Sequence, residues 1–227
     1  MIGFYDYTVI LTYLSLLSAS CGILVALNGG GHPYIGTFLL LFCGLCDAFD
    51  GKVARTKKDR SQEERSFGVQ IDSLSDLVAF GVLPAAIGSA MLRRFGLLSF
   101  ICGTWWERPL RVGATAILIV YILAAMIRLA YYNVTEEERQ KTEDGVRKYF
   151  TGLPVTSSAL IFPLILLLQY VIPADVTPIY FATALICAAA FLSPIRIRKP
   201  GLRGVLILVG IGAVEFLLIL IGRILRH

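Results

Sequence analysis

The chain has 227 residues, of which 56% are hydrophobic and 16% are charged, and its mean hydropathy is +0.73. These values exclude an ordinary soluble domain and fit a polytopic helical membrane protein, with a single domain over residues 1–227. The 21 lysines and arginines exceed the 16 acidic residues, and they lie between apolar runs. This distribution favours loops that face anionic membrane lipids over a site for nucleic acid.

Seven apolar runs come close to the roughly 20 residues that a helix needs to cross a bilayer. They predict an all-α membrane protein with about 6–8 transmembrane helices. The first residues, MIGFYDY, lack the positively charged start of a cleavable signal peptide, so we expect the first run to remain as a transmembrane helix. The runs cover residues 8–27, 34–55, 68–92, 112–133, 154–173, 177–194 and 204–224.

The connections between these runs alternate in charge. Residues 28–33 and 173–175 carry little or no charge, whereas residues 52–65, 134–153 and 195–203 are rich in lysine and arginine. Because basic loops stay on the inner side of a membrane, we expect the last three connections to face the cytoplasm, with the protein in the cell membrane.

Residues 93–111 break this alternation, because they place four arginines on the predicted outer side. Their apolar part, Leu97 to Trp106, is too short to span a bilayer. We interpret the stretch as a surface or re-entrant piece. If it belonged to an additional span, the orientation of every later run would reverse.

Four aspartates lie where the second and third apolar runs meet the charged connection between them. On a helix, Asp47 and Asp50 would share one face of the second run, and Asp72 and Asp76 one face of the third. Ionisable groups in membrane helices are costly and are therefore functional candidates. Carboxylates that meet need compensation, and oxygen ligands suit Mg²⁺, Mn²⁺ or Ca²⁺. The sequence therefore predicts a polar metal site in the helix bundle, near its cytoplasmic face.

The spacing of these residues is D-x-x-D-G-x-x-A-R followed by G-x-x-x-D-x-x-x-D. It resembles the signature of the CDP-alcohol phosphatidyltransferase family at all eight fixed positions. The insert of residues 56–67 between the two halves is longer than this family commonly carries. Because the insert is polar, we expect it to form a longer loop outside the membrane.

The resemblance implies the reaction and the roles of the acids. A hydroxyl of a small acceptor would attack the lipid-bearing phosphorus of CDP-diacylglycerol, and CMP would leave. Asp47, Asp50 and Asp72 would ligate Mg²⁺ or Mn²⁺, as one ion or two. Asp76 would accept the proton of the acceptor hydroxyl while also touching a metal.

The remaining signature residues would bind CDP-diacylglycerol. Gly51, Ala54 and Gly68 are small and would let the nucleotide lie against the backbone, although small residues also suit close helix packing. Arg55 would bind a phosphate. The resemblance also implies a homodimer.

A candidate acceptor site follows from Arg128, Asn133 and Lys148. Arg128 lies well inside an apolar run, where it could hold a substrate anion or extend to the nearby interface. The strings IRLAYYN and YFTGLP resemble those of the phosphatidylserine synthase branch, with Tyr131 and Tyr132 where that branch often has Arg and Phe. This resemblance implies L-serine as the acceptor.

Two other readings stay open. The acceptor could be glycerol phosphate or an inositol phosphate, whose second phosphate Arg128 and Lys148 could bind. From a different class, the acids could line the path of a membrane cation transporter, but a conducted cation has no use for a fixed arginine such as Arg55.

Cysteine and glutamate add two minor features. Cys43 and Cys46 form a C-x-x-C pair inside an apolar run, which we interpret as helix packing rather than a redox site. Glu215 lies near the middle of the last run, and either a partner helix or protonation would account for it.

Overall fold

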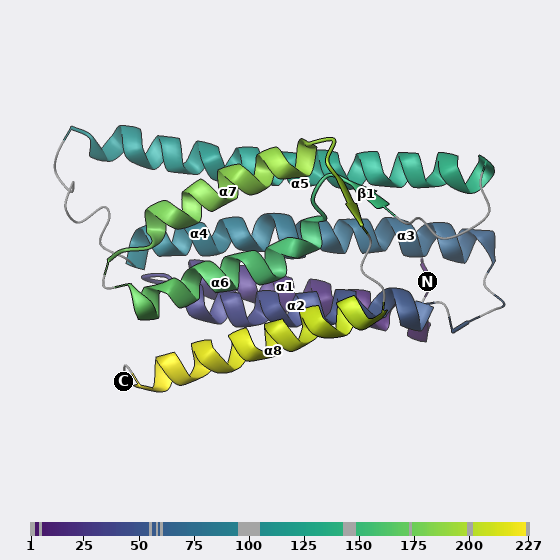
Figure 1. Cartoon of the computed structure of the whole chain (residues 1–227), viewed down its shortest axis with the longest axis horizontal. Helices are drawn as coiled ribbons and strands as arrows, with labels where there is room; N and C mark the ends of the chain where they lie inside the picture. Colours follow the sequence, from purple (N-terminus) through teal and green to yellow (C-terminus); the bar gives the residue numbers. More distant parts are fainter. Residues whose placement is uncertain are drawn as a thin grey trace.

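The computed structural model describes residues 3–4, 6–54, 56–57, 59, 61–94, 105–142, 149–172, 174–198 and 202–225, which form an elongated bundle of roughly aligned helices (Figure 1). The helices are α1 (Ile10–Leu27), α2 (Pro33–Ala54), α3 (Gln62–Asp76), α4 (Leu83–Arg94), α5 (Glu107–Thr142), α6 (Ser158–Val171), α7 (Thr177–Leu192) and α8 (Leu202–Leu225). Each of the seven predicted runs falls on helix. The prediction of an all-α polytopic membrane protein is therefore confirmed.

Among the described residues, five helices are long and apolar enough to cross a membrane. α6 and α7 are shorter apolar helices. The five are Tyr7–Leu27, Pro33–Ala54, Gln62–Arg94, Glu107–Arg139 and Gly204–Gly222.

The outer surface of the bundle suits lipid. On α1, for example, Leu14, Leu17 and Leu24 are exposed, while small residues such as Ser18 and Gly22 are buried against the other helices. A water-soluble helix would show the opposite arrangement, with leucines inside. Small residues at helix contacts and large apolar residues outside are typical of membrane helices.

α3 and α4 form one continuous helical rod from Gln62 to Arg94, joined by the π-helical turn η2 (Leu77–Val82). Ser61 begins α3 with a capping box, in which it pairs reciprocally with Glu64. The predicted loop of residues 56–67 is therefore wrong for residues 62–67. They extend α3, because this cap satisfies its first backbone N–H groups.

α5 is longer than predicted at both ends. Its 36 residues extend about 54 Å, well beyond the roughly 30 Å of a bilayer core. Residues 134–142, predicted as cytoplasmic loop, continue the helix, where Arg139 pairs with Glu136 at 2.7 Å. Residues 107–111 of the predicted re-entrant piece form the first turns of α5, and residues 95–104 lie outside the described residues.

A short two-stranded sheet, absent from the sequence prediction, joins the α5–α6 connection to the end of α7. β1 (Tyr149–Thr151) pairs antiparallel with β2 (Arg196–Arg198). The next residue, Gly152, has a φ of +77°, and a Cβ there would lie 2.6 Å from the carbonyl oxygen of Phe191. Only glycine fits this close approach without strain.

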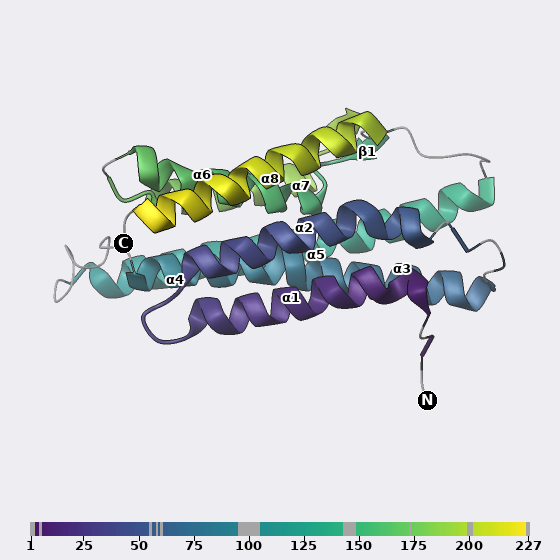
Figure 2. The same cartoon turned by 90° about the horizontal axis from the view of Figure 1, so that it is seen from below.

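The predicted basic connections leave from one end of the bundle. The end of α2, the start of α3, the end of α5, the sheet and the start of α8 all lie there, together with the N-terminus (Figures 1 and 2). The C-terminus and the α1–α2 connection lie at the opposite end. The first half-motif, in the last turns of α2, therefore lies towards this end, and α3, which carries the second half-motif, starts from it.

Candidate functional site

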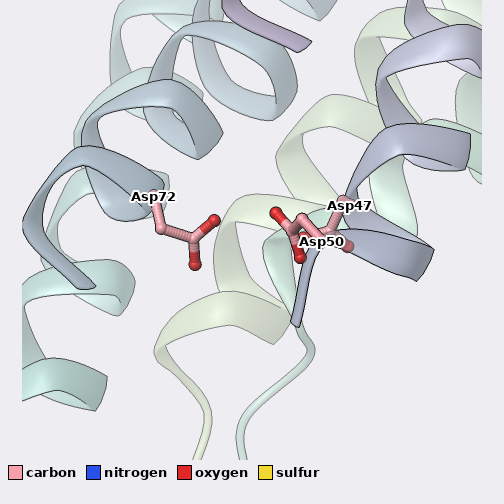
Figure 3. Close-up of side chains that lie close together, drawn as sticks. All are labelled: Asp47, Asp50 and Asp72. Atoms are coloured by element: carbon pink, nitrogen blue, oxygen red, sulfur yellow. The ribbon is translucent and has the colours of Figure 1, made fainter. Parts of the chain in front are cut away.

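Three of the four predicted acids meet across the gap between two helices. Asp47 and Asp50 come from the last turns of α2, and Asp72 faces them from α3 (Figure 3). One carboxylate oxygen from each residue lies within 4.8 Å of the other two, and all three residues are half-buried. The sequence motif therefore becomes one compact acidic cluster.

Side chains next to Asp72 hold α3 in this position from two sides. The Asn133 side-chain amide of α5 donates to the Ser73 hydroxyl at 2.7 Å. The buried Ser75 hydroxyl donates to the carbonyl oxygen of Thr12 in α1 at 3.1 Å. Asp72 thus sits on a helix that is hydrogen-bonded to both of its neighbours.

Asp76 is the last residue of α3, one turn beyond Asp72, and it too is half-buried. It is not part of the group of three whose oxygens lie within 4.8 Å of one another. Its carboxylate is nevertheless close enough to interact electrostatically with Asp47, Asp50 and Asp72. The geometry therefore separates Asp76 from the compact cluster.

The donor set of the cluster fits a hard divalent cation. It offers only carboxylate oxygens, which suit Mg²⁺ or Mn²⁺ rather than a softer ion such as Zn²⁺. Three ionised carboxylates at these separations also repel one another, and a cation between them would remove that repulsion. The residues present therefore fit a metal site.

The predicted nucleotide-binding residues flank the cluster. Gly51 and Ala54 lie in the last turns of α2, where Gly51 is exposed. Gly68 lies one turn before Asp72 on α3 and is half-buried. Arg55 lies outside the described residues.

Arg128 is only 5% exposed, so its side chain lies inside the protein rather than extending to the interface. Its Nε donates to the carbonyl oxygen of Leu153 at 3.2 Å, and its guanidinium lies over the Tyr132 ring at 5.2 Å. It lines a cavity of about 230 Å³ together with Thr151, Ser193 and other residues. Lys148, the other predicted basic group of the acceptor site, lies outside the described residues.

Sequence reasoning missed an ion-pair clasp beside the site. Lys57 Nζ lies 2.7 Å from Asp6 Oδ2 and 3.0 Å from Glu64 Oε1, which joins the N-terminal segment, the α2–α3 connection and α3. The hydrogen bond from Lys57, followed by that from Thr8, lowers the pKa of Asp6 to about 2. The signal that could have helped is Ser61-x-x-Glu64, a capping box that places the start of α3.

Glu215 and the cysteine pair remain outside the site. Glu215 is 5% exposed, and its Oε2 has no hydrogen-bond partner among the residues that the structure describes. Cys43 and Cys46 are buried and unpaired, and the Cys43 thiol donates to the carbonyl oxygen of Ser15. The packing interpretation of the two cysteines agrees with their burial.

The sequence profile of the CDP-alcohol phosphatidyltransferase family matches residues 8–195. The chain is 35% identical over 138 residues to CDP-diacylglycerol--serine O-phosphatidyltransferase of Saccharomyces cerevisiae, covering 60% of this chain and 43% of that protein. It is 32% identical over 148 residues to archaetidylserine synthase of Methanothermobacter thermautotrophicus, covering 65% and 53%. It is 28% identical over 150 residues to CDP-diacylglycerol--serine O-phosphatidyltransferase of Mycobacterium tuberculosis, covering 66% and 45%. The chain thus spans about half the length of these curated relatives.

Proposed function

The chain belongs to the CDP-alcohol phosphatidyltransferase family, and on that premise we propose that it transfers the phosphatidyl group of CDP-diacylglycerol to the hydroxyl of L-serine. The acceptor oxygen forms a bond to the lipid-bearing phosphorus, the bond from that phosphorus to CMP breaks, and the hydroxyl proton passes to a base. The observation that carries this proposal is the cluster of Asp47 and Asp50 from α2 with Asp72 from α3, at the two halves of the family motif.

Asp47, Asp50 and Asp72 would hold a divalent cation, Mg²⁺ or Mn²⁺, as one ion or a pair. A bound divalent cation supplies polarisation of phosphoryl oxygens and neutralises the charge of a pyrophosphate. The protein's own part is to hold three carboxylates in register across two helices, which the hydrogen bonds of Ser73 and Ser75 support.

Asp76 is proposed as the base that accepts the proton of the acceptor hydroxyl. It stands one helical turn, about 5.4 Å along the axis, from Asp72 and outside the compact cluster, so it can face the acceptor while the other three acids face the pyrophosphate. Gly51, Ala54 and Gly68 would let the nucleotide approach the backbone.

Arg55 would pair with a phosphate of CDP-diacylglycerol, since its planar guanidinium makes two parallel hydrogen bonds to such groups. Arg128, with Asn133 and Lys148, is proposed to serve the acceptor. The burial of Arg128 beside a cavity favours an acceptor with an anionic group, which in serine is the carboxylate. Asn133 donates to Ser73, so its contribution would be made through α3.

Serine is favoured over glycerol phosphate or an inositol phosphate because the relatives described above are two serine O-phosphatidyltransferases and an archaetidylserine synthase. A membrane cation transporter is the rival from another class. The fixed arginine of the motif, Arg55, argues against it, because a conducted cation has no use for a fixed arginine beside its ligands.

The protein is proposed to lie in the cell membrane with this end of the bundle facing the cytoplasm. The lysines and arginines of the predicted basic connections support that orientation, because the helix ends that flank these connections lie together at one end of the bundle. A homodimer is proposed from family membership. Native mass spectrometry from nanodiscs tests it, and a monomer-sized mass contradicts it.

An acceptor panel tests the function. Detergent-solubilised protein receives CDP-diacylglycerol with serine, glycerol 3-phosphate or inositol phosphate, with chelator and with Mg²⁺ or Mn²⁺ added back. CMP release that requires both serine and metal is the expected result. CMP release with a phosphorylated acceptor and not with serine would show that serine is the wrong acceptor. Cation uptake into vesicles without CMP release would favour the transporter.

A further inference from the structure

A π-helical turn directly follows Asp76. In η2 the N–H of Leu83 donates to the carbonyl oxygen of Val78, five residues back rather than four. Pro84 comes next and has no N–H, so the carbonyl oxygen of Phe80 loses the donor that an α-helix would supply. Phe80 is fully buried, and an unpaired backbone carbonyl in such a place is destabilising.

Helix α5 supplies a donor to this carbonyl, and α6 supports that donor. The Tyr121 hydroxyl of α5 donates to the carbonyl oxygen of Phe80 at 2.6 Å. The Ser158 hydroxyl, at the start of α6, lies 2.7 Å from the Tyr121 oxygen. Because the single phenol hydrogen goes to Phe80, Ser158 must donate to Tyr121. All three residues are buried, so no water competes for these groups.

The far side of the π-turn is fixed separately. The buried Tyr180 hydroxyl of α7 donates to the carbonyl oxygen of Pro84 at 2.7 Å. Gly88, one turn on, permits the close approach of the Tyr180 ring, since a Cβ there would lie 2.9 Å from it. α4 is therefore anchored, and the winding of η2 decides how α3 is rotated relative to it.

That rotation bears directly on Asp76. A π-turn accommodates one residue more per hydrogen-bonded ring than an α-turn. If η2 rewound as α-helix, the residues before it would rotate relative to α4 by about 100°, the step of one helical residue. Asp76 adjoins η2, whereas Asp72 lies a turn away, with the hydrogen-bonded Ser73 and Ser75 between it and η2. A change in η2 should therefore displace Asp76 more than Asp72.

We propose that Tyr121 and Ser158 are positioning residues for the transfer reaction, which hold the π-turn through the Phe80 carbonyl and thereby aim Asp76 at the acceptor hydroxyl. The inference rests on the proposed function. Neither residue touches substrate. Their effect reaches the reaction through the geometry of the base, where displacements near 1 Å lower turnover by as much as about 10².

The test compares Tyr121→Phe with Tyr180→Phe. Each substitution removes one buried hydroxyl that donates to a carbonyl oxygen of the same rod, at Phe80 in η2 for Tyr121 and at Pro84 in α4 for Tyr180. Tyr121→Phe is expected to lower kcat by about 10-fold or more, with KM for CDP-diacylglycerol and Mn²⁺ affinity, measured by electron paramagnetic resonance, within about threefold of wild type. Tyr180→Phe is expected to lower the melting temperature similarly but to keep kcat within about threefold.

A double-mutant cycle with Asp76→Asn separates positioning from general stability. If Tyr121 acts through Asp76, Tyr121→Phe should cause little further loss of kcat once Asp76 is Asn, whereas independent effects multiply. Ser158→Ala, which keeps the phenol–carbonyl bond, should lower kcat less than Tyr121→Phe but more than Tyr180→Phe, and serves as the main variant if Tyr121→Phe does not fold.

Three outcomes overturn the inference. In the first, Tyr121→Phe and Tyr180→Phe lower kcat equally. In the second, the loss of kcat from Tyr121→Phe multiplies with that from Asp76→Asn. In the third, Tyr121→Phe does not fold and a folded Ser158→Ala protein has the kcat of wild type. Wild-type protein that releases no CMP with any acceptor refutes the transferase itself, and with it the role of Tyr121. Wild-type activity with any of the three outcomes refutes the positioning role alone.

Discussion

Neutralising Asp50 should stabilise the metal-free protein while it removes metal binding. Asp50→Asn keeps the size of the side chain and removes one charge from the cluster, where its carboxylate lies within 4.8 Å of those of Asp47 and Asp72. At an effective dielectric constant near 20, two ionised carboxylates at this distance repel by about 3.5 kcal/mol, so two such pairs amount to about 7 kcal/mol before any relief. Water and shared protons relieve most of this, and we expect a gain of about 1–3 kcal/mol.

Thermal unfolding in detergent measures the effect. With chelator present, Asp50→Asn should melt at a higher temperature than wild type. On addition of Mg²⁺ or Mn²⁺, wild type should gain stability by mass action, and the variant should gain much less because one ligand is gone. Asp59→Asn is the matched control, since Asp59 is an exposed acid in the α2–α3 connection and the charge change is the same.

The opposite pattern would refute this reasoning. If Asp50→Asn melts below wild type in chelator and gains as much stability as wild type from metal, its carboxylate is neither repelled by its neighbours nor a ligand. A higher melting temperature in Asp59→Asn would instead show that the gain in stability comes from the change in net charge.

Three further substitutions test Asp76, the glycine after β1 and the ion-pair clasp of Lys57. Asp76→Asn should lower turnover by roughly 10² to 10⁴ with near-normal metal and CDP-diacylglycerol binding, and a collapse of metal affinity in titrations would make Asp76 chiefly a ligand. Gly152→Ala, at a φ of +77°, should cost at least about 1–2 kcal/mol of unfolding free energy, and an unchanged denaturation midpoint would contradict it. Because the folded pKa of Asp6 is about 2, below its ordinary 3.8, the clasp with Lys57 stabilises above pH 4 and is lost as pH falls towards 2. The melting temperature of wild type should therefore fall more than that of Lys57→Met between pH 5 and pH 3, and equal falls would exclude the clasp.

The acidic cluster could be predicted because its information is local. Asp47 and Asp50, like Asp72 and Asp76, are spaced so that helical periodicity alone puts each pair on one face. Two faces on consecutive helices then need only an antiparallel pairing to meet, and the structure brings Asp47, Asp50 and Asp72 together. The pattern could not predict that Asp72 belongs to the compact cluster whereas Asp76 lies outside it.

The ends of the helices were predicted less well because apolar runs mark the membrane rather than the helix. α3 begins at Gln62 and α5 continues to Thr142, since caps and ion pairs extend helices into water. Loop lengths that are inferred from the polarity of a connection are therefore too long. The capping box at Ser61 was visible in the sequence, and it outweighs the polarity of the residues that follow it.

Contacts between distant segments could not be read from the sequence. Lys57 meets Asp6 across 51 positions, and Tyr121 meets Phe80 across 41. Only Pro84 gave a local hint, because a proline inside a long apolar helix must leave a carbonyl without its usual donor. The partner of that carbonyl depends on how α5 packs, which no periodicity specifies.

The acids of the site are half-buried, and the proposed reaction explains why. Under the proposed reaction, the lipid part of CDP-diacylglycerol stays in the bilayer while the nucleotide and serine come from water, so the reacting phosphorus lies near the boundary. Carboxylates deep in the bundle would be costly to ionise, and fully exposed ones would be screened and mobile. The half-buried cluster near the charged end of α2 avoids both costs. The hydrogen bond from Tyr121 to the rod, one turn beyond Asp76, then supplies the rigidity that such a boundary position lacks.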